Sequence, residues 1–332
     1  MIMPYPRLSI CATMGLTVKI RTQSLFLTLT AVYCAVMTAC SVNKMAINAV
    51  SNTLTAGGSS NVFTGDSDPQ LVGDALPFAI KMYESLLAAN PDHQGLLRTT
   101  GSLLVMYANG FVQKPAEQLP RSMYAERRAA MERAKKLYLR GLQLLYRGLE
   151  LKYPGFDGAS PDAAMLAKMK KADVPSLYWA AAAGLSAFSL NPLDLALGVR
   201  VPEFFALARR AYELDADFNS GALDDFLLLY YASVPASMGG DKARAEDHYR
   251  RALEKSGGLL ASPYVSYAQA VSIPAQDYDT FKVCLNAALA IDPDADKANR
   301  LVNIITQRKA RYLLDNAALY FINIGADDWD DE

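Results

Sequence analysis

The chain has 332 residues, 52% of them hydrophobic, and its 33 basic and 34 acidic side chains leave a formal net charge of −1. This balance argues against a nucleic-acid partner, because such partners are held through a surplus of Lys and Arg. A chain of this length can bury a large hydrophobic core, so its stability need not depend on disulfides.

The most apolar stretch of the chain is Ser24–Met37, which follows Lys19 and Arg21, and no acidic residue occurs in the first 39 positions. As a helix, its 14 residues would extend for about 21 Å, which is shorter than the roughly 30 Å hydrocarbon core of a bilayer. A positive segment, a short apolar segment and small residues at the end are typical of a secretory signal. We therefore predict that residues 1–39 are a signal peptide.

The end of this segment reads "MTAC" and resembles the lipobox of bacterial lipoproteins, in which a peptidase cuts before a cysteine that carries diacylglycerol. Met37 stands where Leu is usual. We predict that acylated Cys40 begins the mature chain, and several acyl chains on one residue give a stable membrane anchor. The alternatives are an uncleaved anchor or an ordinary buried cysteine after a cleaved signal. Both Met1 and Met14 are possible translation starts.

Cleavage before Cys40 would remove three basic side chains and no acidic one, so the net charge of the mature chain would become −4. It would also remove Cys11 and Cys34, after which no internal disulfide is possible. We expect the remaining Cys284 to be a small buried hydrophobe. No cofactor is expected apart from the acyl lipid on Cys40.

Residues 40–70 combine a weakly amphipathic piece with the turn-rich stretches "TAGGSSN" and "TGDSDPQ", which is typical of a tether, part of which can dock on the body. From Leu71 onward apolar residues recur at spacings of three and four, and Pro and Gly stand at the boundaries. We predict an all-α domain over residues 71–316 and an acidic C-terminal tail over residues 317–332. The longest predicted helix is Ser122–Lys152.

Five of the predicted helices carry the pattern of the second helix of tetratricopeptide (TPR) repeats, a small residue followed by an aromatic, a small or apolar residue and a Pro. In chain order these positions are Ala79, Tyr83, Leu86 and Pro91; Leu142, Tyr146, Leu149 and Pro154; Ala208, Ala211 and Ala216; Ala245, Tyr249, Ala252 and Gly257; Phe281, Leu285, Ala288 and Pro293. Their ends are 63, 62, 41 and 36 residues apart, which indicates degenerate TPR-like repeats with inserted helices. A generic helical bundle is the alternative.

The sequence contains few candidates for catalytic or metal-binding residues. His93 and His248 are the two histidines, and neither has a metal-binding partner at ligand spacing. We expect His93 to cap a helix or lie on the surface, and His248 to lie on the charged side of its helix. Asp224 and Asp225 fall at a helix start, where the helix dipole favours them. No nucleophile or phosphate-binding motif occurs, so we predict no enzymatic activity and no metal site.

Aromatic residues beside small and amide side chains are the remaining candidates for a ligand or partner surface. Tyr and Trp next to small residues can line a groove for an apolar ligand with one polar end, although each can equally be a packing residue. The candidates are Tyr178, Trp179, Tyr264, Tyr267, Asn299 and Arg300, with Asn303 and Gln307 on the same helix as the last two.

Several segments together resemble the TRAP-transporter T-component family. They include "VFTGDSDPQLVGDALPFAIKMYESLLAANP", "DVPSLYWAAAAGLSAFSL", "ASPYVSYAQAVSIPAQDYDTF" and "NRLVNIITQRKARYLLD", and with the others they cover nearly all of residues 48–315 in order. The resemblance implies a periplasmic lipoprotein of cryptic TPR-like repeats that self-associates as a homotrimer. It also implies docking of the P-type substrate-binding protein of a TRAP transporter, with a hydrophobic small molecule passing to or from it. The resemblance supplies no catalytic motif, and Cys40 is the one functional residue that it transfers.

Three classes of function remain open. The first is an anchored scaffold and ligand conduit for a TRAP-type importer, because a tether raises the local concentration of partners and helical repeats offer an extended surface. The second is a lipid-anchored adaptor for envelope assembly that carries no ligand. The third, a membrane-attached hydrolase, is disfavoured by the scarcity of histidines. Ser41 after the cysteine favours the outer membrane by the enterobacterial sorting rule, and the inner membrane is the alternative.

Overall fold

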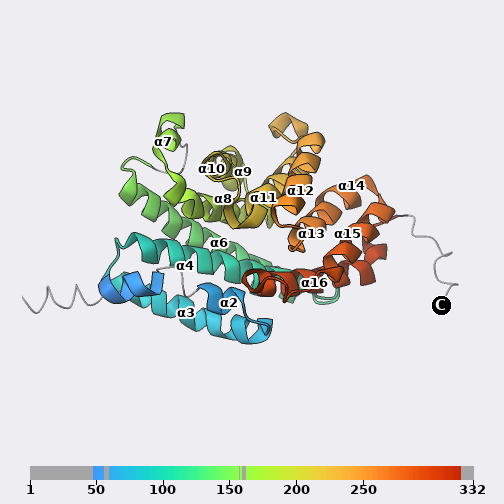
Figure 1. Cartoon of the computed structure of the whole chain (residues 1–332), viewed down its shortest axis with the longest axis horizontal. Coiled ribbons are helices and arrows are strands. Elements are labelled where there is room, and N and C mark those ends of the chain that lie inside the picture. The colour runs from blue at the N-terminus through green and yellow to red at the C-terminus, as the bar shows by residue number, and fades with distance from the viewer. Residues whose placement is uncertain (1–47, 56–59, 157, 159–161, 323–332) are drawn as a thin grey trace, which may run out of the picture. The chain divides into compact units, whose positions relative to one another are not determined.

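A computed structural model describes residues 48–55, 60–156, 158 and 162–322. The chain divides into two units, Met1–Val50 and Ser51–Glu332, and the described residues of the first unit, 48–50, are helical. The predicted signal peptide, Cys40 and the acidic segment over residues 327–332 lie outside the described residues. The second unit contains every element labelled in Figure 1.

The described part of the second unit consists of helices without a strand, which confirms the all-α prediction. The α-helices are α2 (Ser60–Thr64), α3 (Pro69–Ala89), α4 (Gln94–Tyr107), α5 (Lys114–Glu117), α6 (Tyr124–Lys152), α7 (Ala163–Lys168), α8 (Val174–Ser189), α9 (Leu195–Gly198), α10 (Val201–Leu214), α11 (Ala222–Ser233), α12 (Lys242–Lys255), α13 (Ser262–Tyr267), α14 (Ile273–Ala275), α15 (Tyr278–Ala290) and α16 (Arg300–Asp315). Two segments are π-helical, η1 (Ala108–Gln113) and η5 (Ala268–Ser272). Short 3-10 turns are η2 (Lys171–Asp173), η3 (Phe218–Gly221), η4 (Ala236–Met238), η6 (Lys297–Asn299) and η7 (Ala317–Leu319). Within these described residues, no helix is both long enough and apolar enough to cross a membrane.

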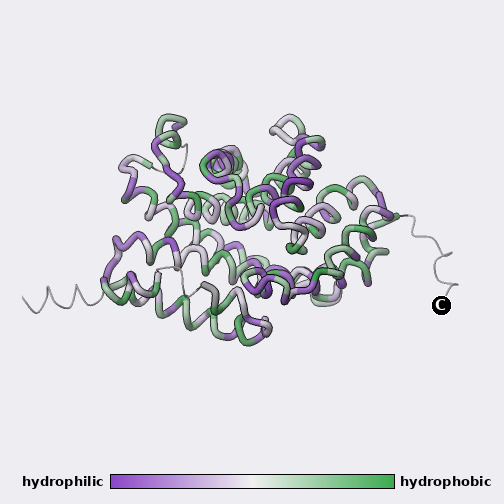
Figure 2. Tube along the Cα trace, viewed as in Figure 1, coloured by the Kyte–Doolittle hydropathy of each residue, from purple (hydrophilic) through white to green (hydrophobic). Residues whose placement is uncertain are grey.

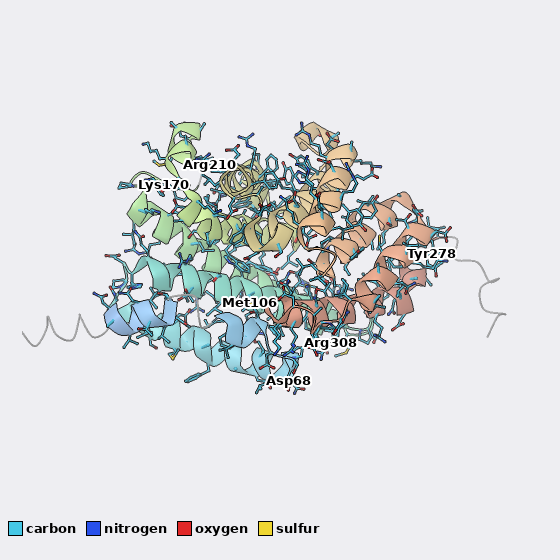
Figure 3. All side chains as sticks on the ribbon, in the orientation of Figure 1. Asp68, Met106, Lys170, Arg210, Tyr278 and Arg308 are labelled. Atoms are coloured by element: carbon cyan, nitrogen blue, oxygen red, sulfur yellow. The ribbon has the colours of Figure 1, made fainter. Side chains whose placement is uncertain are left out.

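Aspartate side chains begin several of the helices. Asp68, labelled in Figure 3, accepts hydrogen bonds from the backbone N–H groups of Gln70 and Leu71 at 2.9 and 3.1 Å. Asp241 before α12 and Asp277 before α15 accept equivalent bonds. These carboxylates satisfy N–H groups that have no partner within the helix, and they complement the positive end of its dipole.

Helices that follow one another in the chain pack as neighbours: α3 with α4, α4 with α6, α6 with α8, α8 with α10, α11 with α12, and α15 with α16 (Figure 1). Each long helix alternates between hydrophobic and hydrophilic residues along the tube in Figure 2, because one side of it is buried. Repeat-pattern residues supply the buried side, with Tyr83 at 4%, Ala245 at 1% and Leu285 at 0% exposure. This packing confirms a TPR-like helical repeat stack.

Small residues allow two of these pairs to approach closely. A Cβ atom on Gly141 of α6 would lie 2.9 Å from the carbonyl oxygen of Gly101 on α4, so the two backbones are in contact. A Cβ atom on Gly184 of α8 would lie 2.4 Å from the ring of Phe204 on α10. Glycine is therefore required sterically at these two crossings.

The last helix of the stack returns to the first ones. Helix α16 contacts α2 and α3, and Arg300 donates from Nη1 to the carbonyl oxygen of Gly65 at 3.0 Å. Near the other end of α16, Lys309 pairs with Glu117 of α5 at 2.9 Å. These contacts join parts of the chain that lie 235 and 192 residues apart, and the second of them holds α5 against α16.

Both ends of the predicted helical domain have further packed residues. On the N-terminal side, the hydroxyl of Tyr83 donates to the carbonyl oxygen of Leu54 at 3.1 Å, so helical residues 51–55 lie against α3. On the C-terminal side, Phe321 is 7% exposed and its ring lies 4.9 Å from that of Phe281. The body of the unit thus includes residues on either side of 71–316.

Candidate functional site

The two π-helical segments interrupt otherwise regular helices. One of them, η1, joins α4 to α5, and Lys114 is the first residue after it. A π-helical turn contains an extra residue, which shifts the side chains that follow it around the helix axis, and such turns are frequent at functional sites. The apolar spacing of three and four continues through this segment, so the periodicity of the sequence does not predict the π-helical turn.

Lys114 is enclosed by protein but has no direct partner. Its side chain forms no hydrogen bond or ion pair with any residue in the described part of the chain, and its ammonium nitrogen is still reachable by a water molecule. Burial lowers the pKa of Lys114, against the negative charges of Glu117 and Asp225, which raise it, while the positive charge of Lys309 lowers it further. Lys114 is thus a half-buried lysine whose nearest described charges are those of Glu117, Asp225 and Lys309.

Asp225, in the first turn of α11, lies near this lysine. Its Oδ1 atom is buried and accepts no hydrogen bond from the residues that the structure describes. Burial raises the pKa of Asp225, and the hydroxyl groups of Ser266 and Ser262 on α13 and the charge of Lys114 act in the opposite direction. Because the net shift is upward, the site favours the neutral form of this carboxyl group more than water does.

Glu117 and Lys309 complete the group of charges. Their 2.9 Å ion pair connects α5 to α16, and the Lys309 side chain is 6% exposed. The charges that act on Lys114 are those of Glu117, Asp225 and Lys309. We refer to Lys114, Glu117, Asp225 and Lys309 as the interior charge cluster.

An aromatic group borders the interior charge cluster. The ring of Tyr178 on α8 lies 5.1 Å from that of Trp179 and 5.4 Å from that of Phe218. Burial raises the pKa of Tyr178, and the negative charge of Asp225 raises it further, which places this phenol within electrostatic range of the cluster. Neither its hydroxyl group nor the ammonium of Lys114 has a hydrogen-bonding partner among the described residues.

The structure thus places one of the sequence-predicted residues, Tyr178, within electrostatic range of charges that the sequence did not reveal, and the ring of Trp179 lies against it. Asp225 was expected only as a favourable residue at a helix start. It does occupy the first turn of α11, but it also faces α13 and Lys114. Lys114 follows no recognisable motif, since two of the three charges that act on it, those of Asp225 and Lys309, come from helices more than 100 residues away.

The other predicted residues lie elsewhere. Tyr264 and Tyr267 on α13 pack around Tyr249, with ring centroids 6.1 and 4.2 Å away, in a different hydrophobic cluster from Tyr178. Asn299 donates to Asp296 in its own turn, and Arg300 binds Gly65 and Asp294. Their contacts hold the helices together and do not join the interior site.

The amide groups on α16 are structural as well. Asn303 is 1% exposed, accepts from the Ala261 N–H at 2.9 Å and donates to the Leu259 carbonyl at 2.8 Å. Gln307 donates to the carbonyl oxygens at the end of α15, including that of Ile291 at 2.7 Å. These bonds satisfy backbone groups at helix ends, where partners within the helix are missing.

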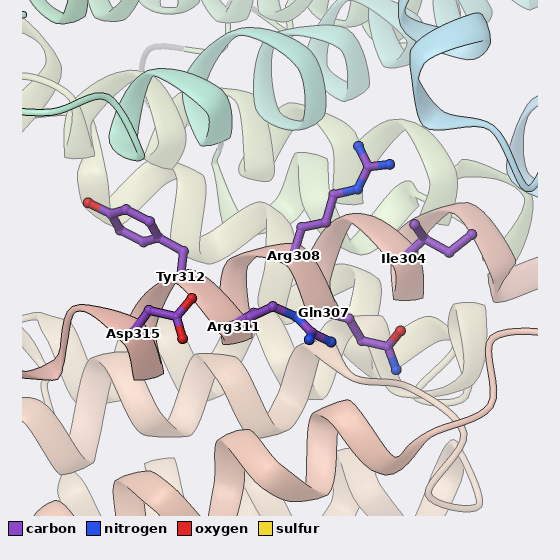
Figure 4. A pocket seen from close by; sticks show the side chains of 6 residues that line it. All are labelled: Ile304, Gln307, Arg308, Arg311, Tyr312 and Asp315. Carbon is purple, nitrogen blue, oxygen red and sulfur yellow. The ribbon is translucent and has the colours of Figure 1, made fainter. Parts of the chain in front are cut away.

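The outer side of α16 has a shallow groove of about 360 Å³ (Figure 4). Its lining residues all come from this one helix: Ile304, Gln307, Arg308, Arg311, Tyr312 and Asp315. Arg308 and Arg311 are exposed, and within the described ranges they form no ion pair. The groove presents the positive charges of these two arginines to solvent.

The two histidines have structural partners. His93 caps α4, with Nδ1 accepting from the Leu96 N–H at 3.1 Å, as predicted. The prediction for His248 was wrong, because this residue is 9% exposed and its Nδ1 lies 2.7 Å from Oδ1 of Asp224. The other oxygen of Asp224 accepts from Lys255 at 2.8 Å, so two partners compensate this fully buried carboxylate. They hold the pKa of Asp224 below its usual range even though burial acts to raise it.

By its architecture, the described part of the chain is a helical-repeat protein. Residues 65–321 match the family described as TRAP transporter T-component. A protein of Treponema pallidum (strain Nichols), described as uncharacterized, is 33% identical over 308 residues, which cover 87% of this chain and 95% of the relative. The chain belongs to the TRAP transporter T-component family, a transporter accessory family and not an enzyme family.

Proposed function

We propose that this protein is a periplasmic lipoprotein, anchored by acyl chains on Cys40, that serves a TRAP-type solute import system. In this role it docks the P-type substrate-binding protein and exchanges a hydrophobic ligand with it. Family membership supports the link to a TRAP system, and the apolar leader before Cys40 supports export and anchoring. The predicted homotrimer belongs to the same proposal.

The interior site supports the part of the proposal that concerns ligand exchange. A desolvated lysine without a direct partner, near an Asp225 carboxyl group whose charge also acts on Tyr178, is unexpected for a pure scaffold, because a desolvated ammonium group costs free energy unless something solvates it. A ligand with an apolar body and one polar end would lie against the aromatic rings and reach Lys114.

The decisive experiment is a pull-down with the native acylated protein, followed by mass spectrometry of bound proteins and extracted lipids. A TRAP P-type protein and a co-extracted small amphiphile are expected. Acylation is read from the same sample as the mass of the N-terminal peptide, and a chain that retains its leader without fatty acid would contradict the anchor.

Replacing both aromatic residues tests the ligand path. The double variant Tyr178→Ala and Trp179→Ala should lose the co-extracted ligand while it keeps the partner, because both rings are partly buried against one hydrophobic cluster. Tyr264→Ala is a matched control in a separate hydrophobic cluster. If ligand content is the same in all three proteins, the path does not pass these rings.

A lipid-anchored adaptor for envelope assembly is the second candidate, and the extended helical surface favours it equally. It predicts an empty lipid extract and captured proteins other than a TRAP component. Turnover of an esterase, glycosidase or peptidase substrate would instead revive the hydrolase alternative.

A further inference from the structure

One side of α3 carries apolar side chains that lie outside the core. Leu71 is 58% exposed, Phe78 77% and Met82 38%, and Ala75 is also exposed. These residues are three, four or seven positions apart, so they share one side of the helix. Helix α3 lies at the lower edge of the second unit in Figure 1, and a different side of it is buried against its neighbours. We refer to Leu71, Ala75, Phe78 and Met82 as the apolar stripe of α3.

The charged residues of α3 occupy a third side. Asp74, Lys81 and Glu84 are spaced by seven and three positions, and Lys81 pairs with Glu84 at 2.9 Å. A surface helix ordinarily has one apolar side, which faces the core. A second, exposed apolar side is typical of a helix that also meets a membrane or another protein.

The N-terminal connection of the unit favours the membrane. Residues 51–55 lie against α3, where the hydroxyl of Tyr83 donates to the carbonyl oxygen of Leu54. The 11 residue steps from Cys40 to Ser51 extend over no more than about 40 Å. Acyl chains on Cys40 would therefore keep α3 close to the bilayer surface.

The size of the apolar stripe also favours the membrane over a second copy of the chain. Its three large side chains expose roughly 350 Å² together, if a fully exposed side chain of this kind has about 200 Å². A stable interface between two proteins usually buries about 800 Å² on each partner. A chain that acyl groups already hold at the membrane needs only a weak additional contact, because its local concentration there is high.

We propose that the apolar stripe of α3 lies on the lipid surface of the membrane that holds the acyl anchor, so that the helical stack keeps one fixed side towards the bilayer. This inference rests on the anchor in the proposed function and adds the orientation of the anchored unit. Phe78, the most exposed of the four residues with a large side chain, inserts deepest, while the charged side of α3 stays in water. Because Asp74, Lys81 and Glu84 give no surplus of positive charge, the contact does not require anionic lipid.

The test places a nitroxide spin label on α3 of the acylated protein in phosphatidylcholine nanodiscs. Ala75→Cys introduces the labelling position in the apolar stripe and keeps its three large side chains. Cys40 carries lipid in this protein and Cys284 is 4% exposed, so the label should go to the introduced thiol. Ala88→Cys is the matched control, because Ala88 is also exposed but lies about 140° further around the same helix.

The measured quantity is the collision rate of the label with O₂ divided by that with a water-soluble nickel chelate. This ratio should be several-fold higher at position 75 than at position 88, because the apolar side of an interfacial helix is buried in lipid. Phe78→Glu should remove the difference, whereas Leu195→Glu, at an 83% exposed leucine on α9, should leave it unchanged. Leu71→Glu replaces Phe78→Glu if that variant loses helical content by circular dichroism. Addition of phosphatidylglycerol should not change the ratio.

Equal ratios at the two positions, in a chain that remains bound to the nanodiscs, would overturn the inference and leave the acyl anchor intact. Dipolar coupling between labels at position 75 of two chains would also overturn it, because a second copy would then cover the apolar stripe. A chain without fatty acid that does not bind the nanodiscs would contradict the proposed anchor itself, and the inference would fall with it.

Discussion

The ion pair between Glu117 and Lys309 provides the most direct test of how the fold positions the interior site. It joins α5 to α16 across 192 residues of sequence, and the Lys309 side chain is almost fully buried. Lys309→Met largely keeps the aliphatic stem and removes the charge, which leaves the Glu117 carboxylate with the Gln113 amide as a hydrogen-bond donor but without its charged partner.

The expected cost follows from the exposure of the two groups. Removal of one partner from a fully buried ion pair destabilises a protein by about 3–5 kcal/mol, because the remaining charge is left uncompensated. The side chain of Glu117 is 26% exposed, so water can partly solvate it after the substitution. We therefore expect a loss of about 2–3 kcal/mol in the free energy of unfolding.

Urea unfolding followed by circular dichroism measures this loss, with Lys282→Met as the control. Lys282 pairs with Asp279, which is 93% exposed, and its removal should change stability by no more than about 0.5 kcal/mol. The double variant Glu117→Gln and Lys309→Met should recover much of the loss, because no charge is then left unpaired. If Lys309→Met is as mild as Lys282→Met, the ion pair does not hold α16 against α5, and the reasoning fails.

Gly184→Ala should lower the free energy of unfolding by about 1–3 kcal/mol, because the new methyl group would overlap the ring of Phe204, whereas Gly148→Ala, with its nearest contact at 3.6 Å, should be neutral or slightly stabilising. The thermal midpoints of the two variants separate these outcomes. Asp225→Asn should stabilise the protein at pH 7, because asparagine does not ionise. The pKa of Asp225 is raised in the folded state, so the protein loses stability as the pH rises from 3.8, the pKa in the unfolded chain, through the pKa in the folded state. The gain should therefore disappear below about pH 3.8, and a gain that is independent of pH would exclude titration of this carboxyl group as its cause. His248→Ala should lower the free energy of unfolding by about 2 kcal/mol at pH 7, because Asp224 would then keep only Lys255 as a charged partner. If the variant is as stable as the parent, the His248–Asp224 pair contributes nothing to stability.

Sequence periodicity was sufficient for the helical architecture. The sequence signals for helices are local: apolar spacings of three and four, Asp before the first residue of a helix, and small residues within it. The helices of the structure occur where these signals predict them. The long helix predicted over Ser122–Lys152 is observed as α6, Tyr124–Lys152. The recognition of the T-component family likewise required only the order of segments along the chain.

The interior site depended on tertiary structure. A lysine, an aspartate and an ion pair on α5, α11 and α16 have no common spacing, and a π-helical turn leaves no distinct periodicity before Lys114. His248 was assigned to the charged side of its helix because its neighbours in sequence are charged, but Asp224 from another helix makes its burial favourable. The amino-acid sequence by itself determined which segments are helices and which of their sides are apolar, because these properties depend on residues three and four positions apart. Only the packing of distant helices decided which polar side chains became enclosed together, because the free energy of a buried charge depends on partners that the local sequence does not contain.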